Sequence, residues 1–347
     1  MRRILYIITI AVLFITSCDV HEWPDLPETV PCHIKLNYNT NFTKWNHIYN
    51  NSQVIEEGFG ETYDNQMQYG QIRYIVRTYP ITDNNVLSQN YTQEFTFVKD
   101  IAEGYDFETT LEVIPGDYNV MVWSDLVQTQ SNEHFYNATN FVEIKLQGTH
   151  YGNNNWRDSF RGAGEVSLKA DILDDAPDSL SIQMQRPMGK YEFITTDLQE
   201  FMRKELEFLT KEAATKGDQV PTRVNTENYK VVFLYAPYMQ NTYNMFADKP
   251  IDVSEGIYIE SKLNIIDENN ASIGFDYVFT NPFLTYVAVQ IGFYDDKDRQ
   301  IALSNPINVP LNRDYHTILR GSFLMQQAQG GIVIDPSFNG NHNIVIP

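Results

Sequence analysis

Apolar and polar residues alternate with a period of two in many short segments of this 347-residue chain. The pattern runs through residues 34–38, 72–77, 95–97, 144–146 and 180–184. Such alternation is typical of half-buried antiparallel strands, whose successive side chains point to opposite faces of the sheet. Asn, Gly and Pro separate the segments at short intervals, which favours sandwiches over parallel sheets connected by helices. We therefore predict an all-β chain built from antiparallel β-sandwiches.

One segment in the second half breaks this pattern and predicts an amphipathic helix over about residues 197–215. Thr196 and Gln199 match a capping box at its start, and Gly217 supplies a stop at its end. Five apolar residues share one face of this helix: Leu198, Phe201, Met202, Leu206 and Leu209. We expect this face to pack on a sheet; a partner-binding helix is the alternative.

The length of the chain suggests two domains after a processed segment. We predict a signal peptide over residues 1–17, an acidic tether over 18–30, an N-terminal sandwich over 31–180 and a C-terminal sandwich over 181–347. The boundary follows a loop-like stretch at residues 174–177, and the predicted helix lies in the second sandwich. No internal repeat relates the two halves.

The first 18 residues combine a positive start, an apolar run and a cysteine. Arg2 and Arg3 precede a run of 13 mostly apolar residues, which is too short to span a bilayer comfortably. The residues Ile15-Thr16-Ser17-Cys18 resemble a bacterial lipobox, in which the cysteine is lipidated and becomes the first residue. We expect acylation, palmitate included, at Cys18 and attachment to the cell outer membrane, since durable attachment needs two or more chains. An ordinary secretory signal with an incidental cysteine is the alternative.

The residues after Cys18 are acidic and contain prolines. Pro24 and Pro27 disfavour a helix and favour an extended tether. Asp19, Glu22 and Asp25 resemble the export signal of surface lipoproteins in Bacteroidetes-type bacteria, and this resemblance implies exposure at the cell surface. The alternative is a soluble spacer.

Charge and motifs exclude several classes of function. The chain carries 25 basic and 45 acidic side chains, a formal charge of −20, and a field of that sign repels nucleic acid. The seven histidines are isolated, and the sequence contains no nucleophile elbow, P-loop or dinucleotide fingerprint. We therefore expect no catalytic residue, no metal, no cofactor and no enzyme activity. Asp295, Asp296 and Asp298 read as a solvated hairpin tip, with a calcium ion as the alternative.

Cys32 is the second of two cysteines in the chain. It lies in the strand-like run from Val30 to Tyr38, and we expect a buried apolar side chain there, not a nucleophile.

Two aromatic stretches read as loops. One contains Tyr151 and Trp156, and the other contains Tyr235, Tyr238 and Tyr243. Exposed rings on loops mark binding or assembly surfaces, and aromatic platforms hold the faces of sugar rings. These five residues are our candidate ligand or assembly residues. Packing in a sandwich core is the alternative, because aromatic side chains also fill cores.

Several stretches taken together resemble one family. They are residues 18–24, 115–118 with 122–125, 150–158, 186–193 with 196–198, and 330–336. They resemble Bacteroidales lipoproteins that are related to the fimbrillins and to fimbrial anchor or accessory subunits. The resemblance implies two transthyretin-like β-sandwiches, an outer-membrane lipid anchor, and subunits that join by donating a strand across an open sheet edge.

The same resemblance bears on maturation. Fimbrillin shafts are cleaved after an arginine or lysine in the first strand region, and this chain has neither between Cys18 and Lys35. A retained anchor or accessory role is therefore favoured over a shaft role; a tip or shaft role is the alternative, since later basic residues such as Lys44 exist. If a strand is donated, the candidate is the short apolar segment Asn343–Pro347; a final strand within its own sheet is the alternative.

We therefore expect a surface-exposed outer-membrane lipoprotein that acts as a fimbrial anchor, accessory or adhesion subunit and assembles by strand exchange. The implied partners are the outer membrane, other fimbrial subunits and a ligand on a host or bacterial surface. A glycan-binding surface lipoprotein that uses the aromatic loops is the alternative.

Overall fold

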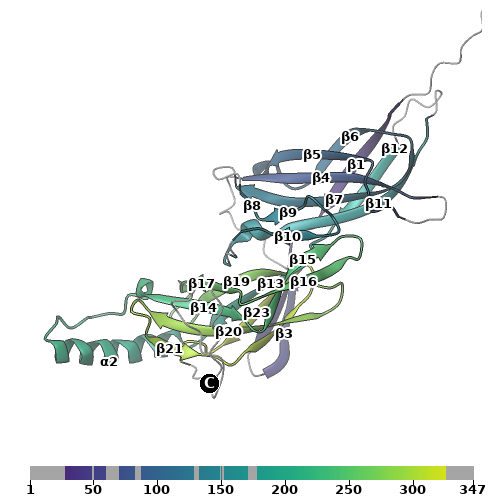
Figure 1. Cartoon of the computed structure of the whole chain (residues 1–347). Helices are drawn as coiled ribbons and strands as arrows, with labels where there is room; N and C mark the ends of the chain where they lie inside the picture. Colours follow the sequence, from purple (N-terminus) through teal and green to yellow (C-terminus); the bar gives the residue numbers. More distant parts are fainter. Residues whose placement is uncertain are drawn as a thin grey trace, which may run out of the picture.

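The computed structural model describes residues 28–48, 51–59, 70–82, 87–128, 133–148, 150, 152–170 and 178–325, with the backbone alone for 45–48, 51–59, 128 and 133. Within these residues the chain is almost entirely β-structure with one long helix, which confirms the predicted fold class. Figure 1 shows two connected parts, with most of the early strands in one and the helix at the far end of the other.

The first sandwich packs a three-stranded sheet on a larger sheet. The three-stranded sheet has the order β12-β1-β6, and the larger one has the order β11-β7-β4-β5 with β8 paired to β7. The strands are β1 (Val30–Tyr38), β4 (Gly70–Pro80), β5 (Gln93–Asp100), β6 (Phe107–Val113), β7 (Gly116–Gln128), β8 (Glu133–His134), β11 (Ser159–Leu168) and β12 (Asp178–Met184), with a short 3-10 turn, η2 (Ile101–Glu103), after β5.

Strand β1 shows why the alternating sequence folds this way. Cys32, Ile34 and Leu36 are each at most 1% exposed and enter the core between the two sheets, whereas Lys35 faces solvent. β1 pairs antiparallel with β6 on one side and parallel with β12 on the other. The prediction for Cys32 is confirmed, and burial raises the pKa of its thiol to about 11, so that it stays protonated at neutral pH.

The second sandwich is built the same way from two sheets. One has the order β18-β19-β13-β23-β2-β3, and the other has the order β17-β14-β20-β21 with β22 paired to β20. The strands are β2 (Thr43–Ile48), β3 (Asn51–Phe59), β13 (Met188–Thr195), β14 (Tyr229–Tyr235), β17 (Tyr258–Ser261), β18 (Asn264–Ile265), β19 (Ala271–Phe279), β20 (Thr285–Asp295), β21 (Gln300–Leu303), β22 (Ile307–Leu311) and β23 (Tyr315–Gly321), with a 3-10 turn η4 (Thr226–Asn228) before β14.

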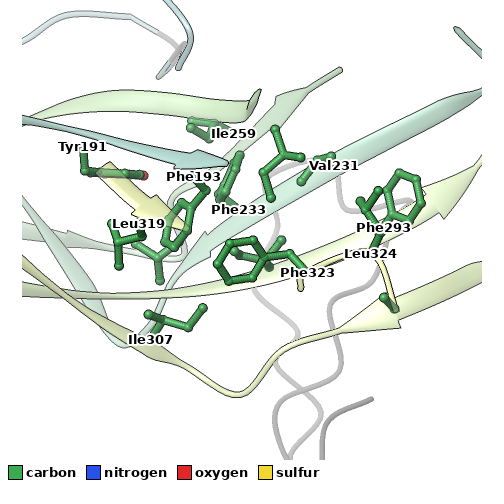
Figure 2. Close-up of a cluster of buried hydrophobic side chains, with 14 of the residues drawn as sticks. Tyr191, Phe193, Val231, Phe233, Ile259, Phe293, Ile307, Leu319, Phe323 and Leu324 are labelled. Carbon is green, nitrogen blue, oxygen red and sulfur yellow. The ribbon is translucent and has the colours of Figure 1, made fainter. Parts of the chain in front are cut away.

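Aromatic rings fill the core of this sandwich (Figure 2). Phe193 of β13 stacks on Phe233 of β14, with 5.5 Å between ring centroids, and meets Phe323 edge-on at 5.3 Å. Such offset and edge-to-face pairs add to the stabilisation that burial of the rings already provides. Many of the aromatic side chains therefore pack in the hydrophobic core.

The position of a strand in the sequence does not determine which sandwich it joins. β2 and β3 come from the first half of the chain but extend the sheet of the second sandwich, since β2 pairs parallel with β23. A fifth sheet, in the order β16-β15-β10-β9, joins β9 (Tyr136–Asn137) and β10 (Ile144–Leu146) to β15 (Tyr238–Asn244) and β16 (Lys249–Glu255). The division of the chain at residue 180 stays a prediction; these pairings tie its two halves together.

The helix α2 (Leu198–Lys216) lies one residue later than predicted and covers one end of the second core. All five residues of the predicted apolar face belong to or pack against that core. Gly217 ends the helix with a left-handed φ of 75°, as expected. The predicted capping box is wrong: the N-cap is Asp197, and its carboxylate accepts hydrogen bonds from the Thr195 hydroxyl and the backbone N–H groups of Leu324 and Met325 instead.

The predicted hairpin tip at residues 295–298 connects β20 to β21. Asp295 accepts hydrogen bonds from the backbone N–H groups of Lys297 and Arg299, so its carboxylate closes the turn. Within the described residues no group of three or more acidic, His or Cys side chains is placed to hold a metal ion. None of the described helices combines the length and hydropathy needed to cross a bilayer.

We predict that Phe201→Ala lowers the free energy of unfolding by about 3–5 kcal/mol, because this ring is 1% exposed and its removal leaves a cavity. Phe208, on the same helix, is 42% exposed and contacts the Arg299 guanidinium, so Phe208→Ala should cost less than about 1 kcal/mol. Urea unfolding of the purified chain measures both values. Equal losses in the two variants would contradict the packing of α2 described here.

Candidate functional site at the junction of the two sandwiches

The segment between β10 and β11 runs through the junction of the two sandwiches and carries the polar groups that meet there. It includes the 3-10 turn η3 (Asn155–Arg157), which is capped by the side chain of Asn154 accepting a hydrogen bond from the Trp156 N–H at 3.0 Å. The turn places Arg157 against β19, and Arg157 is only 2% exposed.

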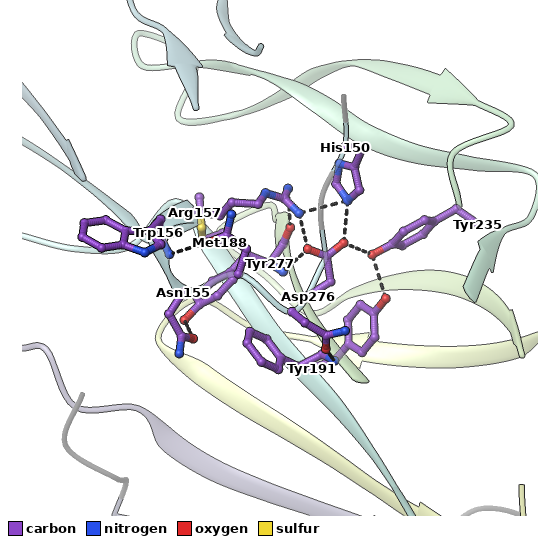
Figure 3. Close-up of polar contacts among 12 residues, drawn as sticks. His150, Asn155, Trp156, Arg157, Met188, Tyr191, Tyr235, Asp276 and Tyr277 are labelled. Atoms are coloured by element: carbon purple, nitrogen blue, oxygen red, sulfur yellow. Dashed lines mark hydrogen bonds and ion pairs between the residues drawn. The ribbon is translucent and has the colours of Figure 1, made fainter. Parts of the chain in front are cut away.

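Asp276 of β19 is the centre of the first buried network (Figure 3). Arg157 donates to one carboxylate oxygen, and Tyr235 donates to the other, which also lies 2.7 Å from His150 Nε2. Arg157 also donates to the Tyr277 carbonyl at 3.0 Å, and the Tyr277 N–H donates to Asp276 at 2.8 Å. Both oxygens are thereby occupied, which a buried carboxylate requires.

Burial and charge set the protonation states in this network. Burial raises the pKa of the Asp276 carboxyl, but the adjacent Arg157 and His150 outweigh it and hold the pKa below its usual range. Burial and the Arg157 charge both lower the pKa of His150. Burial raises the pKa of Tyr235 well above its ordinary value. At neutral pH the network is therefore one carboxylate, one guanidinium and neutral His and Tyr groups.

A second buried network lies where β12 turns into β13. Arg186 is fully buried, and its Nε donates to both oxygens of Asp158 at 2.9 and 3.0 Å. Its Nη2 donates to the Thr40 carbonyl at 2.7 Å, in the link between β1 and β2. The guanidinium lies 3.8 Å from the centroid of the Phe42 ring. Arg186, in the β12–β13 turn, therefore contacts two other connecting segments: the one before β11 and the one between β1 and β2.

A third set of contacts attaches the β15–β16 turn. Asp248, in the left-handed region with a φ of 52°, accepts from Arg161 of β11 at 2.6 Å and from Arg313 at 2.9 Å. The Tyr243 hydroxyl donates to the same carboxylate. A turn from the second half of the chain is therefore held on a strand of the first sandwich.

A small hollow opens beside the Asp276 network. Its volume is about 100 Å³, and its lining residues include His150, Arg157, Asn241 and Ser254. Pockets that hold ligands usually measure about 300–1,000 Å³, so this hollow has room for a few water molecules only. Because the groups around Asp276 bind one another, the described part of this network acts as a structural joint.

The five aromatic candidate residues differ in their exposure to solvent and in the elements that carry them. Tyr151 lies outside the described residues. Trp156 is half-buried and packs against both the first core and the junction, over Gly70, where even a Cβ would lie 2.1 Å from the ring. Tyr235 and Tyr243 are at most 1% exposed and lie in strands β14 and β15, which corrects the expected loop. Tyr238 is 45% exposed.

The N-terminal candidates Cys18, Asp19, Glu22 and Asp25 also lie outside the described residues, as does Asn343–Pro347. Sequence reasoning missed the junction residues. A usable signal was present: Asp276 lies in the otherwise apolar run Ala271–Phe279, and a carboxylate in such a run must be paired when it is buried. The identity of its partners was not readable from the pattern.

We predict that Asp276→Asn lowers the free energy of unfolding at pH 7 by about 3–5 kcal/mol, because it leaves Arg157 buried without a counter-charge. The folded-state pKa of Asp276 lies below the unfolded value of about 3.9, so its contribution is present above that pH and is lost as the pH falls towards the folded-state pKa. The variant should lack this acid-sensitive component.

Urea unfolding between pH 3 and pH 7 measures both effects. Glu207→Gln is the matched control, since the Glu207–Arg203 pair is more than half exposed and should contribute less than about 1 kcal/mol. Wild-type stability in Asp276→Asn would show that the junction does not depend on this charge.

No protein of curated function is similar to the chain in sequence. Among solved structures, a Bacteroides thetaiotaomicron protein provisionally described as polysaccharide binding (DUF1812) is 9% identical, with 79% of each chain covered and a TM-score of 0.42. The fimbrial anchor protein Mfa2 from Porphyromonas gingivalis is 11% identical, with 79% of this chain and 81% of that chain covered and a TM-score of 0.35.

A Bacteroides ovatus protein provisionally described as an adhesin is 12% identical, with 89% of this chain and 94% of that chain covered and a TM-score of 0.41. Likenesses at these scores do not assign a role to the chain. The model of a family of unknown function (DUF6562) matches residues 27–347. Because the match spans most of the sequence, the chain belongs to the DUF6562 family.

Proposed function

We propose that the chain is a surface-exposed outer-membrane lipoprotein, acylated at Cys18, that acts as a retained fimbrial anchor or accessory subunit. The observation that carries this proposal is the position of β1. It begins twelve residues after Cys18 and is the central strand of its sheet. A chain anchored at Cys18 is thus connected directly to a core strand.

The place of β1 in the core also bears on maturation. Lys35, the first basic residue after Cys18, is in the middle of β1, between the buried Ile34 and Leu36. Cleavage after Lys35 would divide a strand that pairs on both sides and would separate Cys32 and Ile34, two of its three most buried side chains, from the rest of the core. An uncut β1 that keeps the sandwich on its lipid supports an anchor over a shaft subunit.

The length of the connection limits the distance from the membrane. Eleven residues separate Cys18 from Val30, and at about 3.3–3.6 Å per residue they reach at most about 40 Å. The first sandwich is therefore held close to the bilayer. The second sandwich, with α2 at the end of the molecule away from β1 (Figure 1), lies farther from the tether.

Strand exchange needs an open edge, and we propose β16 for it. In the described part of the chain β16 pairs with β15 along one side. Its Ile251 and Val253 are 45% and 43% exposed, so an incoming strand would find both unpaired backbone groups and apolar side chains. The edge strand β5 also exposes Val98, but the charged residues Lys99 and Asp100 follow it directly.

The alternative of glycan capture through the two aromatic stretches has less support. Of its described residues, Tyr235 and Tyr243 are buried and Trp156 is used in packing, which leaves Tyr238 as the exposed ring. We retain Tyr238 as a candidate contact residue in an assembly or ligand surface.

We predict that Cys18→Ala releases the protein from membranes into the soluble fraction, because it removes the acylated residue. Cys32→Ala is the matched control and should stay membrane-bound, since Cys32 is buried in the first core. Fractionation followed by immunoblotting measures the distribution. Firm membrane attachment of Cys18→Ala would refute the lipoprotein proposal.

The mass of the mature wild-type protein completes this test. The retained-anchor role requires an acylated N-terminus at Cys18. A mature protein that begins after Lys35 or Lys44 would instead indicate maturation of the shaft type.

We predict that outer-membrane extracts run in SDS without heating show a high-mass ladder that collapses to the monomer on heating, because an added strand contributes a full set of backbone hydrogen bonds. Val253→Lys on β16 should abolish the ladder, since a lysine on an edge opposes pairing. Val98→Lys on the β5 edge should leave it unchanged. A monomer band in both lanes for the wild type would exclude stable strand exchange.

A further inference from the structure

A larger hollow lies on the first sandwich, away from the junction. Its volume is about 420 Å³, and it lies between the β4–β5 connection and the β9–β10 connection. Its lining residues are Arg77, Tyr79, Gln89, Asn90, Tyr91, Thr139, Asn140 and Val142. This volume falls within the range of small-molecule sites, which is about 300–1,000 Å³.

A three-layer stack forms the rigid part of the hollow. The Arg77 guanidinium lies between two rings, 4.2 Å from the centroid of Phe141 and 4.7 Å from that of Tyr91. Arg77 Nη2 also donates to the Thr139 carbonyl at 3.0 Å. One buried side chain from β4 thus fixes both connections and holds the Tyr91 ring, which is 45% exposed, in place.

The charge of Arg77 is neutralised within the protein. Its Nε donates to Glu94 at 2.7 Å, and the Nη2–Glu94 distance is 2.6 Å. The hollow therefore presents no uncompensated positive charge, and the chain as a whole carries a net charge of −20. An anionic ligand such as a phosphate or a sialylated glycan would meet an unfavourable field.

Three carboxamides supply the recognition chemistry. Gln89, Asn90 and Asn140 are exposed at the rim of the hollow. Within the described residues, neither the Gln89 side chain nor the Asn90 side chain forms a hydrogen bond. Asn140 uses only its Oδ1, which accepts from the Val142 N–H at 2.9 Å and leaves both amide N–H groups available. A carboxamide both donates and accepts, which matches vicinal hydroxyl groups.

We propose that this hollow binds a neutral carbohydrate, with one pyranose ring seated against Tyr91 and its hydroxyl groups hydrogen-bonded to Gln89, Asn90 and Asn140. An aromatic ring contacts the C–H face of a sugar, and paired amides read its hydroxyl groups. A mainly apolar ligand would leave these amides without partners on binding, which is costly. The site would provide the ligand contact of an adhesive subunit, but the proposal does not depend on the membrane anchor or on strand exchange.

The test uses the purified full-length chain on a glycan array. One arm carries neutral host-type oligosaccharides, a second carries neutral bacterial polysaccharide fragments, and a third carries sialylated and sulfated glycans. We expect binding in a neutral arm, and the arm that binds identifies the source of the sugar. Titration calorimetry with the bound oligosaccharide then gives the affinity of each variant.

Two variants and one control locate the site. Tyr91→Ala removes the ring, and Asn140→Asp keeps the acceptor for Val142 but removes the two N–H donors. Each should weaken binding more than tenfold, while thermal unfolding confirms that the variants are folded. Tyr286→Ala is the control, because Tyr286 is 56% exposed on β20 and does not line the hollow, and it should bind as the wild type does. Tyr238→Ala tests the other exposed ring, on β15, which the proposal does not require for sugar binding.

Other results would overturn the proposal. They are no binding in either neutral arm, binding in the acidic arm alone, wild-type affinity in Tyr91→Ala and Asn140→Asp, or loss of binding in Tyr238→Ala alone. The last result would move the sugar site to the β15 surface. None of these readouts requires a membrane or an SDS-resistant ladder, so failure here is separable from failure of the anchor proposal.

Discussion

The buried contact between Arg186 and Asp158 holds the architecture together. Arg186 comes from the turn between β12 and β13, and Asp158 follows the 3-10 turn before β11. The same guanidinium binds the Thr40 carbonyl and lies over Phe42, in the link from β1 to β2. The β1–β2 link and the β12–β13 turn connect one sandwich to the other, and the segment before β11 leads from the β16-β15-β10-β9 sheet to the first sandwich. Removing Arg186 would leave the buried Asp158 without its counter-charge, which costs far more than losing a surface pair.

This joint explains why the two sandwiches form one body. Interfaces between domains are usually modest and allow relative motion. Here β2 pairs with β23, β10 pairs with β15, and Arg161 binds Asp248, so backbone ladders and ion pairs both cross the junction. A pull on the second sandwich is therefore carried by hydrogen bonds to the first, and through β1 to the tether. That arrangement suits a subunit that has to transmit force from a partner to a lipid anchor.

Local pattern predicted much of the fold. The period of two located β1, β4 and β12, and the apolar stripe located α2 within one residue, because both depend on neighbours in the sequence. Pairing over long distances was not predictable. Nothing in residues 43–48 indicates that they pair with Tyr315–Gly321, and alternation alone does not distinguish a parallel neighbour from an antiparallel one. The aromatic stretch at 235–246 resembles a loop in sequence because Pro237, Asn241 and Asn244 interrupt it. In the structure, long-range packing buries Tyr235 and Tyr243.

The buried arginines also determine what the surface presents. Arg157 and Arg186 each pair with a buried carboxylate, and the buried Arg77 pairs with Glu94 at the surface, so these three positive charges are neutralised by partners within the fold. The acidic excess of the chain, 45 acidic against 25 basic residues, is then carried largely by the surface. Such a surface is repelled by the phosphate groups of an outer membrane, whereas acyl chains at Cys18 would hold the chain to it. In the proposed anchored form these two forces act against each other through the short tether, which favours a tether at full extension and keeps the neutral, amide-lined hollow accessible to uncharged ligands.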